Sequence, residues 1–151
     1  MSVYQSNVAA KAKPRLMSDG LTDPSFVCAG LYVTQAEVSL PANVKPGDTI
    51  TLTQDMPEGW AVIPQLSSIT KVGPVSTEMT VVVGDATDED RYSTALDIAA
   101  AATTPVKMEF VRGVDAITPA KCTNSPIVAK IVSASGTNEC KLTVTLAFSA
   151  M

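Results

Sequence analysis

The sequence predicts an all-β protein built as a single β-sandwich or jelly-roll-like domain, and three observations support this class. Val and Thr are frequent, with ten prolines and eight glycines spread among them, a composition that favours short strands joined by turns. Several segments alternate apolar and polar residues, as a strand with one buried face does. With 151 residues, 46% of them hydrophobic, the chain can bury the core of one domain.

Residues 1–27 are predicted to form an extended N-terminal arm ahead of the sandwich domain at residues 28–151. The segment is rich in Ser, Ala, Lys, Asp and Pro and shows little periodicity. Lys11, Lys13 and Arg15 give it positive charge and are candidates for contact with a neighbouring molecule. A disordered terminus is the alternative, whereas an arm ordered against a neighbour suits a protein built to assemble.

The chain between Leu40 and Tyr92 is predicted to form a β-meander. Turn signals at residues 45–48, 57–59 and 71–74 each combine Gly with Pro, which suits the corner of a tight turn. The apolar residues between the first two turns alternate with threonines, as on a half-buried strand. The strands predicted here, together with one that precedes the meander, cover residues 30–40, 49–53, 60–63 and 79–83.

Residues 84–104 allow two interpretations. As a short helix near residues 88–100, the segment would begin at Thr87 as N-cap, with an apolar face at helical spacing. As a strand, Tyr92, Thr94, Leu96 and Ile98 would alternate after an acidic turn. The alanines favour a helix and the β-branched residues a strand, so the sequence leaves both open.

The last third of the chain returns to β-structure. Residues 106–110 and 141–149 show clean alternation and are predicted strands, and the second of these would tie the C-terminal segment into a sheet. Residues 126–133 form a mixed apolar run that could be buried on both faces. Residues 135–138 form a turn of hairpin length. Residues 113–125 form a long polar loop, which we expect to be a contact element.

Composition and charge exclude several classes of function. The net charge of −4 disfavours a general affinity for nucleic acid or for an anionic membrane surface. The charge is uneven, because residues 46–98 hold two cations and nine anions. These charges belong either to solvated loops or to complementary contacts between copies. No signal peptide or membrane-length apolar run is visible, so we expect a soluble protein made in a reducing cytoplasm.

The sequence offers no catalytic or cofactor-binding set. It contains no histidine, which removes the commonest general base and the commonest metal ligand. Cys28, Cys122 and Cys140 match no zinc spacing and are expected to be small buried thiols, although a pair between the last two is open. No nucleotide-binding or nucleophile motif occurs. We therefore predict a non-enzymatic protein without a cofactor or a resident metal.

One acidic cluster stands out at residues 85–90. Asp85, Asp88, Glu89 and Asp90 could bind Ca²⁺, but their spacing does not fit an EF-hand loop. The preferred interpretation is a solvated turn in which Asp and Thr cap backbone N–H groups. Arg91 would pair with Asp85 or Asp88, or with a carboxylate of a neighbouring subunit.

Trp60 lies between a turn and a strand, and two roles are open for it. It could bind carbohydrate, but a tryptophan with no aromatic neighbour in sequence is more often a core or interface anchor. The residues singled out as interface candidates are Lys11, Lys13, Arg15, Trp60, Asp85, Asp88, Arg91 and Tyr92.

Short motifs in the middle of the chain resemble a pattern found in small virion structural proteins of tailed bacteriophages. Residues 48–52 fit D-x-I-x-L, and residues 57–62 fit P-x-G-x-x-V. Gly84-Asp85 then precedes an acidic segment that ends on Arg91-Tyr92. The resemblance covers about a third of the chain.

This resemblance implies a capsid decoration (cement) protein or a related head-fibre base. Such proteins are commonly small, β-rich and often trimeric, and they bridge neighbouring major capsid subunits. The implied partners are the major capsid protein and further copies of this chain, with a trimer favoured. The implied location is the capsid surface of a virion assembled in the host cytoplasm. The alternative is a fibre or tail module that binds a host receptor or glycan.

Overall fold

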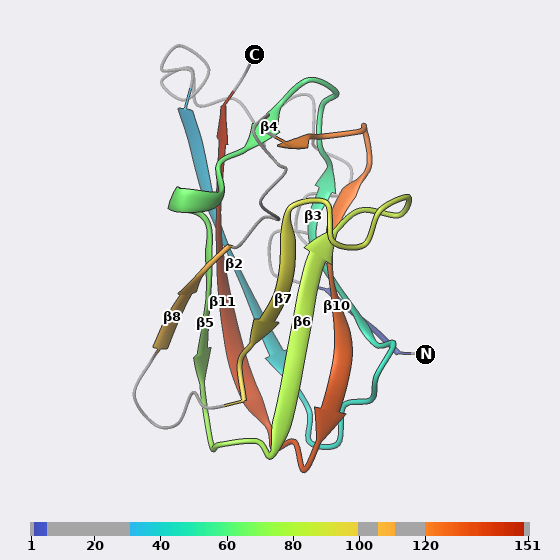
Figure 1. Cartoon of the computed structure of the whole chain (residues 1–151), viewed down its shortest axis with the longest axis vertical. Coiled ribbons are helices and arrows are strands. Elements are labelled where there is room, and N and C mark those ends of the chain that lie inside the picture. Colours follow the sequence, from blue (N-terminus) through green and yellow to red (C-terminus); the bar gives the residue numbers. More distant parts are fainter. Residues whose placement is uncertain (1, 6–30, 100–105, 111–119, 150–151) are drawn as a thin grey trace.

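The fold is a sandwich of two β-sheets, which confirms the predicted class (Figure 1). The structure is a computed structural model that describes residues 2–5, 31–99, 106–110 and 120–149. Within these ranges the helical content is limited to one 3₁₀ turn, η1 (Pro64–Leu66), and no helix is long and apolar enough to cross a membrane.

Each sheet is assembled from strands that are distant in sequence. The first sheet has the order β1 (Val3–Gln5), β3 (Thr49–Asp55), β10 (Pro126–Ser135), β6 (Glu78–Gly84) and β7 (Ser93–Asp97). The second sheet has the order β8 (Val106–Glu109), β5 (Ser68–Val72), β11 (Cys140–Ser149), β4 (Ala61–Val62) and β9 (Ala120–Lys121), with β2 (Leu31–Leu40) also paired to β11.

Strand β11 organises the second sheet. It pairs antiparallel with β2 over ten residues, from Cys140 opposite Leu40 to Ser149 opposite Leu31. Its other edge pairs first with β5 and then with β4. The predicted strand at residues 141–149 is therefore confirmed, and the C-terminal segment is held on both sides.

The core lies between the two sheets and is filled by alternate residues of their strands. On β3, Ile50 and Leu52 point inward and are fully buried. On β2 and β11 the inward residues alternate with outward ones that are mostly polar, as predicted, although Leu31 and Val33 of β2 are exposed and Ala147 of β11 is buried. The fully buried side chains of the core include Leu40, Ile50, Leu52, Ile69, Met79, Ile98, Ile127, Ile131, Leu142 and Phe148.

The predicted meander is wrong in its connectivity. The first two turns are where the sequence places them, and Gly47 and Gly59 have the positive φ that their turns require. The third predicted turn is only partly correct, because residues 71 and 72 belong to β5 and the bend begins at Gly73. However, the chain passes from β3 in the first sheet to β4 and β5 in the second, and then back to β6. The hairpin-length turn at residues 135–138 likewise joins β10 to β11 across the sandwich. Alternation shows which face of a strand is buried but does not show which sheet the strand joins.

Two further expectations are corrected or resolved. Strand β10 is buried on one face only, because Ile127, Ala129 and Ile131 are buried whereas Val132 is 49% exposed. Within residues 84–99, the part of the ambiguous segment that the structure describes, the strand applies: residues 93–97 form β7, and no helix occurs between residues 88 and 99. Pairing with β6 places Leu96 in the core, and this tertiary contact outweighs the local helix propensity of the described residues.

Two predicted contact segments lie mostly outside the described residues. Of the polar loop, residues 113–119 are not described, whereas Ala120 and Lys121 form β9 and pair with β4. Of the arm, residues 6–27 are not described, and Val3–Gln5 pairs in parallel with β3 as β1. The division into an arm and a domain stays a prediction.

Lys71 is a buried cation that the sequence pattern did not reveal. Its side chain is fully buried on β5, and its Nζ donates hydrogen bonds to Ser76 Oγ at 3.1 Å and to the Ala99 carbonyl at 3.5 Å. Burial lowers the pKa of Lys71. These bonds join β5 and the β5–β6 connection to the chain just beyond β7. Cys140, which lies nearby, and Cys122 are both free and buried, as the sequence led us to expect.

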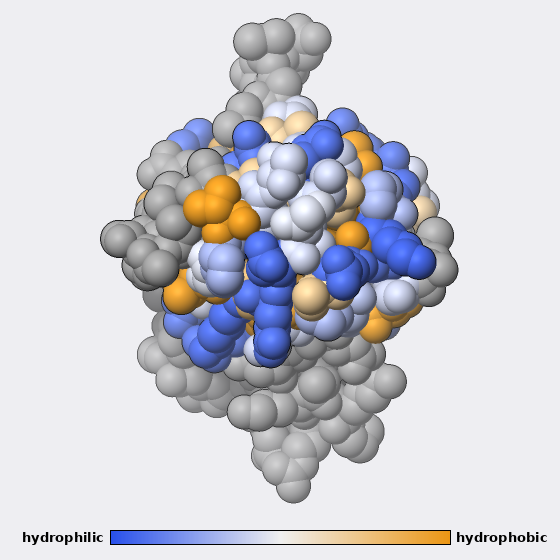
Figure 2. All heavy atoms as spheres, turned by 90° about the horizontal axis from the view of Figure 1, so that it is seen from below, coloured by the Kyte–Doolittle hydropathy of each residue, from blue (hydrophilic) through white to orange (hydrophobic). Residues whose placement is uncertain are grey.

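One end of the sandwich is hydrophilic. It is formed by the β2–β3, β5–β6 and β10–β11 connections at the bottom of Figure 1, and Figure 2 views it directly. Apolar residues are scattered there, with Val72 39% and Val75 54% exposed. Single exposed valines are ordinary on protein surfaces, so the described part of this end presents no broad apolar contact surface.

The register of β3 can be tested by a pair of adjacent substitutions. Ile50→Ala removes a fully buried side chain and should lower the free energy of unfolding by about 2–5 kcal/mol. Thr51→Ala, on the opposite face of the same strand, should cost less than about 1 kcal/mol. Urea denaturation of both variants measures the difference, and equal losses would contradict the register.

Candidate functional site

The interface candidates within the described residues lie at the end of the sandwich opposite the hydrophilic one. Asp85, Asp88, Arg91 and Tyr92 belong to the connection between β6 and β7, and Trp60 immediately precedes β4. Figure 1 shows both connections in the upper half of the molecule. Residues 120–125 run between them, so that candidates 25 residues or more apart in sequence become parts of one structure. The basic candidates Lys11, Lys13 and Arg15 lie outside the described residues.

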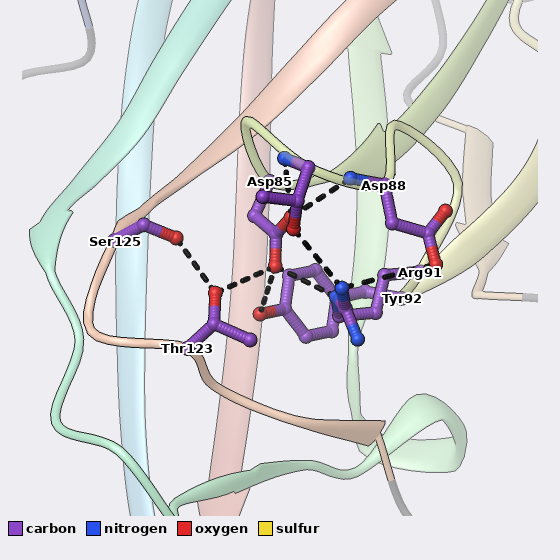
Figure 3. A network of polar contacts seen from close by, with 7 residues as sticks. Asp85, Asp88, Arg91, Tyr92, Thr123 and Ser125 are labelled. Atoms are coloured by element: carbon purple, nitrogen blue, oxygen red, sulfur yellow. Dashed lines mark hydrogen bonds and ion pairs between the residues drawn. The ribbon is translucent and has the colours of Figure 1, made fainter.

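The carboxylate of Asp85 is the centre of this region (Figure 3). Its Oδ1 accepts hydrogen bonds from the Thr87 N–H at 2.9 Å, the Thr87 hydroxyl at 2.7 Å and the Asp88 N–H at 3.0 Å. Its Oδ2 accepts one from the Thr123 hydroxyl at 2.8 Å and a long one from the Tyr92 hydroxyl at 3.5 Å. Asp85 therefore shapes its own loop and joins it to the segment that follows β9.

Asp85 stays ionised although it is 5% exposed. Burial alone would raise the pKa of its carboxyl, but the hydrogen bonds from Thr87, Thr123 and the Asp88 N–H outweigh burial and lower the pKa to about 2. Arg91 Nε lies 2.7 Å from Oδ2. This contact is an ion pair rather than a hydrogen bond, because the Nε–H has no acceptor in suitable geometry.

Gly84 lets the acidic loop fold back onto the end of β6. A Cβ atom built at this residue would overlap the Asp88 carbonyl oxygen and lie 2.6 Å from the Glu89 carbonyl oxygen. These are backbone atoms that cannot move aside independently of the loop. The two residues of the Gly84-Asp85 pair thus have different roles. Gly84 leaves space for the loop backbone, and the hydrogen bonds of Asp85 stabilise the folded-back conformation of the loop.

The segment after β9 connects the Asp85 network to Trp60. The Cys122 N–H donates to the Trp60 carbonyl at 2.6 Å, and the Gly59 N–H donates to the Cys122 carbonyl at 3.4 Å. The next residue, Thr123, bonds to Asp85. Burial raises the pKa of the Cys122 thiol to about 11 and also raises the pKa of the fully buried Tyr92 hydroxyl. Both groups are therefore poor nucleophiles and serve as packing and hydrogen-bonding groups.

Trp60 is part of an aromatic cluster rather than an isolated ring. Its ring centroid lies 5.9 Å from that of Tyr32 in an edge-to-face arrangement and 6.3 Å from that of Phe148. Phe148 is fully buried, whereas Tyr32 and Trp60 are partly buried and pack against the core. The companions of Trp60 come from β2 and β11, which no local sequence signal could indicate.

The acidic residues that follow Asp85 point toward solvent. Residues 86–90 are all exposed, and Glu89 forms an ion pair with Lys130 of β10. A hydrogen bond with Asp88 raises the pKa of Asp90. The described residues bring together no group of three Asp, Glu, Cys or His side chains suited to a metal ion. The Asp85 oxygens already accept bonds from protein donors. The arrangement therefore presents a rigid acidic loop, a surface suited to binding.

The roles of several residues in this region could not be predicted from the sequence. Thr123 and Ser125, whose hydroxyl lies 2.9 Å from that of Thr123, follow Asp85 by 38 and 40 residues, and nothing in their local pattern marks them. Gly84 was noted as part of a motif, but its close contact with the loop backbone appears only in three dimensions. The local pairing of Arg91 with Asp85 was one of the alternatives, and it is the one that the structure contains.

Comparison with known proteins gives a likeness of fold. No protein-family model and no curated protein matches the chain. A chain of the cyanophage Pam1 capsid asymmetric unit shares the fold with a TM-score of 0.57 and 17% identity, over 80% of this chain and 85% of that one. A chain of the acidic stable capsid structure of Helicobacter pylori bacteriophage KHP30 matches with a TM-score of 0.47 and 19% identity, over 80% of this chain and 89% of that one.

Replacing Asp85 by Asn should destabilise the protein in a pH-dependent way. Because the folded-state pKa lies below the ordinary value of 3.8, the ionised carboxylate stabilises the fold above pH 3.8, and this contribution disappears as the pH falls toward 2. The Asp85→Asn variant should lose roughly 2 kcal/mol of unfolding free energy at pH 7 and show a shallower acid dependence between pH 4 and 2.

Chemical denaturation at a series of pH values measures this loss. Asp88→Asn is the matched control, because the Asp88 side chain is 45% exposed and its ion pair with Arg91 is long, at 4.0 Å. It should change the free energy of unfolding by less than about 1 kcal/mol. An Asp85→Asn variant as stable as the wild type at pH 7 would show that the network does not hold the loop.

Replacing Gly84 by Ala should disrupt the acidic loop through steric overlap alone. We expect a loss of at least about 3 kcal/mol in unfolding free energy, because backbone atoms occupy the space of the added methyl group. Gly47→Ala is the control: the new methyl group meets nothing within 4 Å, but φ is +92°, so backbone strain should cost about 1–2 kcal/mol. Thermal unfolding compares the two, and a smaller loss for Gly84→Ala would contradict the close packing.

Proposed function

We propose that the chain is a non-enzymatic structural protein of a bacteriophage virion, and that it binds the capsid surface as a decoration protein. Its partners in this proposal are the major capsid protein and further copies of itself, with a trimer as the assembly unit. It acts by bridging neighbouring subunits, so its effect depends on buried area and surface complementarity. It needs no cofactor, no nucleic acid and no membrane.

The observation that carries this proposal is the likeness to a chain of the cyanophage Pam1 capsid asymmetric unit. The shared sandwich extends over 80% of this chain and 85% of that chain, so the likeness involves nearly the whole of each. At 17% identity the likeness is one of fold. The short motifs at residues 48–52, 57–62 and 84–92 resemble those of phage virion proteins and lend independent support from sequence.

The described surface suits a protein that binds by complementarity. The acidic loop is held in one conformation by Asp85 while Asp88, Glu89 and Asp90 remain exposed. A rigid loop loses little conformational entropy when it is bound. A segment with the composition of residues 1–27, which holds three cations and two anions, would complement such an acidic surface on a neighbouring molecule.

The alternative of a receptor- or glycan-binding module depends on Trp60. Carbohydrate-binding tryptophans present a free ring face to the sugar, but the Trp60 ring packs against Tyr32 and Phe148 and joins the core. An anchor role uses these contacts directly. We therefore give precedence to the capsid-binding function.

Binding to empty capsids tests the proposal. The purified chain should sediment with shells that lack it and raise the temperature at which those shells disassemble. Lys11→Ser/Lys13→Ser should weaken this binding by about tenfold, which corresponds to about 1.4 kcal/mol, because two charges of the arm are removed. The protein's own melting temperature should not change.

The matched control removes two charges at the hydrophilic end. In Lys45→Ser/Lys141→Ser both substituted side chains are exposed, and the change in net charge is the same. This variant should bind shells within about twofold of the wild type. Equal weakening by both variants would show that net charge rather than the arm matters, and a wild-type chain that never sediments with shells would overturn the proposed function.

A further inference from the structure

Strand β1 is a three-residue edge strand that lies in a docking slot formed by the start of β3 and by Asp48. It pairs in parallel with the start of β3, with Val3 opposite Thr49, Tyr4 opposite Ile50 and Gln5 opposite Thr51. The Thr49 N–H donates to the Ser2 carbonyl at 3.0 Å. The other edge of β3 pairs with β10. Without β1, the first residues of β3 would present an open sheet edge.

A buried aspartate closes one end of this slot. Asp48 is 3% exposed, and its Oδ1 accepts a hydrogen bond from the Ser2 N–H at 2.8 Å. Its Oδ2 accepts one from the Lys45 N–H at 3.0 Å and a long one from the Tyr4 hydroxyl at 3.5 Å. Hydrogen bonds from the Lys45 and Ser2 N–H groups lower the pKa of Asp48. Two of its three donors thus come from residues 2–5, and an empty slot would leave a buried carboxylate short of partners.

The chain that joins β1 to the rest of the protein is long. Residues 6–30 separate β1 from β2, and Figure 1 shows β1 beside β3 while β2 begins at the far end of the other sheet. Twenty-five residues can span up to roughly 80 Å, about twice the diameter expected for a domain of this size. The same length of chain can carry β1 to a neighbouring copy.

Identical contacts form whichever copy supplies the strand. The slot can hold β1 of its own chain or β1 of a neighbouring copy. Because the hydrogen bonds and the buried area are the same in both arrangements, the balance between them depends on the effective concentration of each strand. A tether of this length gives an effective concentration on the order of 1 mM, and copies held side by side in an assembly reach a similar value. Exchange of an identical element between protomers is a route to oligomers at low energetic cost.

We propose that β1 is exchanged between copies, so that the β3 edge and Asp48 form a docking site for residues 2–5 of a neighbouring copy. The occupant is specified by the slot: an extended segment with a free N–H next to Asp48 and a tyrosine two residues later. Exchange would link copies of the chain without any partner protein, so this inference does not depend on capsid binding.

Disulfide trapping between separate copies tests the exchange. Val3→Cys and Thr49→Cys are introduced into two differently tagged full-length chains that also carry Cys28→Ser, and the chains are co-expressed and oxidised at about 1 mM. Val3 is 63% exposed and lies opposite Thr49, so the two thiols are held side by side when β1 of one chain occupies the slot of the other. We expect a disulfide-linked heterodimer on a non-reducing gel.

Two controls make the result decisive. Val3→Cys paired with Val33→Cys, which is 44% exposed on β2, measures random collision and should give less than about a tenth of the product. Val3→Cys and Thr49→Cys placed together in one chain report the intramolecular arrangement as a cross-linked monomer. If this double variant forms only monomer at 1 mM and the mixed chains form no heterodimer above the Val33→Cys control, the exchange is ruled out.

Discussion

The upper end of this sandwich depends on one buried carboxylate. Asp85 accepts hydrogen bonds from its own loop and from Thr123, which follows β9 in the second sheet, and it forms an ion pair with Arg91. These donors keep the group ionised in spite of burial and convert its charge into a fixed loop conformation. Thr123 adjoins Cys122, whose N–H bonds to the Trp60 carbonyl, so the same segment also holds the backbone of Trp60.

Asp48 repeats this design at the edge of the first sheet. It too is buried, accepts backbone N–H groups, and joins segments that are distant in sequence, namely Ser2 and Lys45. Lys71 is the cationic counterpart, buried and bonded to Ser76 and Ala99. In each case a buried charged side chain joins separate segments of the chain through hydrogen bonds.

Rigid loops and an exchangeable edge strand would serve assembly in different ways. A preorganised acidic loop presents charge without the entropic cost of ordering it upon binding. Strand exchange would add main-chain hydrogen bonds between copies, which persist at salt concentrations that screen surface charges. If the chain binds a capsid as proposed, the two together would give the repeated shell both specificity and mechanical continuity, even though each contact is small.

The candidate site was only partly accessible from the sequence. Asp85, Asp88, Arg91 and Tyr92 stand out because they are charged or aromatic and close together in the chain. Thr123, Ser125 and the companions of Trp60 do not, because their roles depend on contacts between segments that lie 28 residues or more apart in the chain. The acidic cluster forms a turn in which Asp85 caps backbone N–H groups, as predicted. This was predictable because Asp85 bonds to Thr87 and Asp88, which lie within three residues of it in the chain.

By itself, the sequence determined the class of fold, the buried face of most strands and the position of most turns. All of these follow from short-range chemistry: the period-two alternation of β3 and β11, and the positive φ that Gly47 and Gly59 supply. Tertiary structure alone decided which sheet each strand joins, that residues 93–97 form a strand, and that Thr123 joins the donors around Asp85. These outcomes depend on pairing between distant segments, where the free energy of the shared core outweighs local preference.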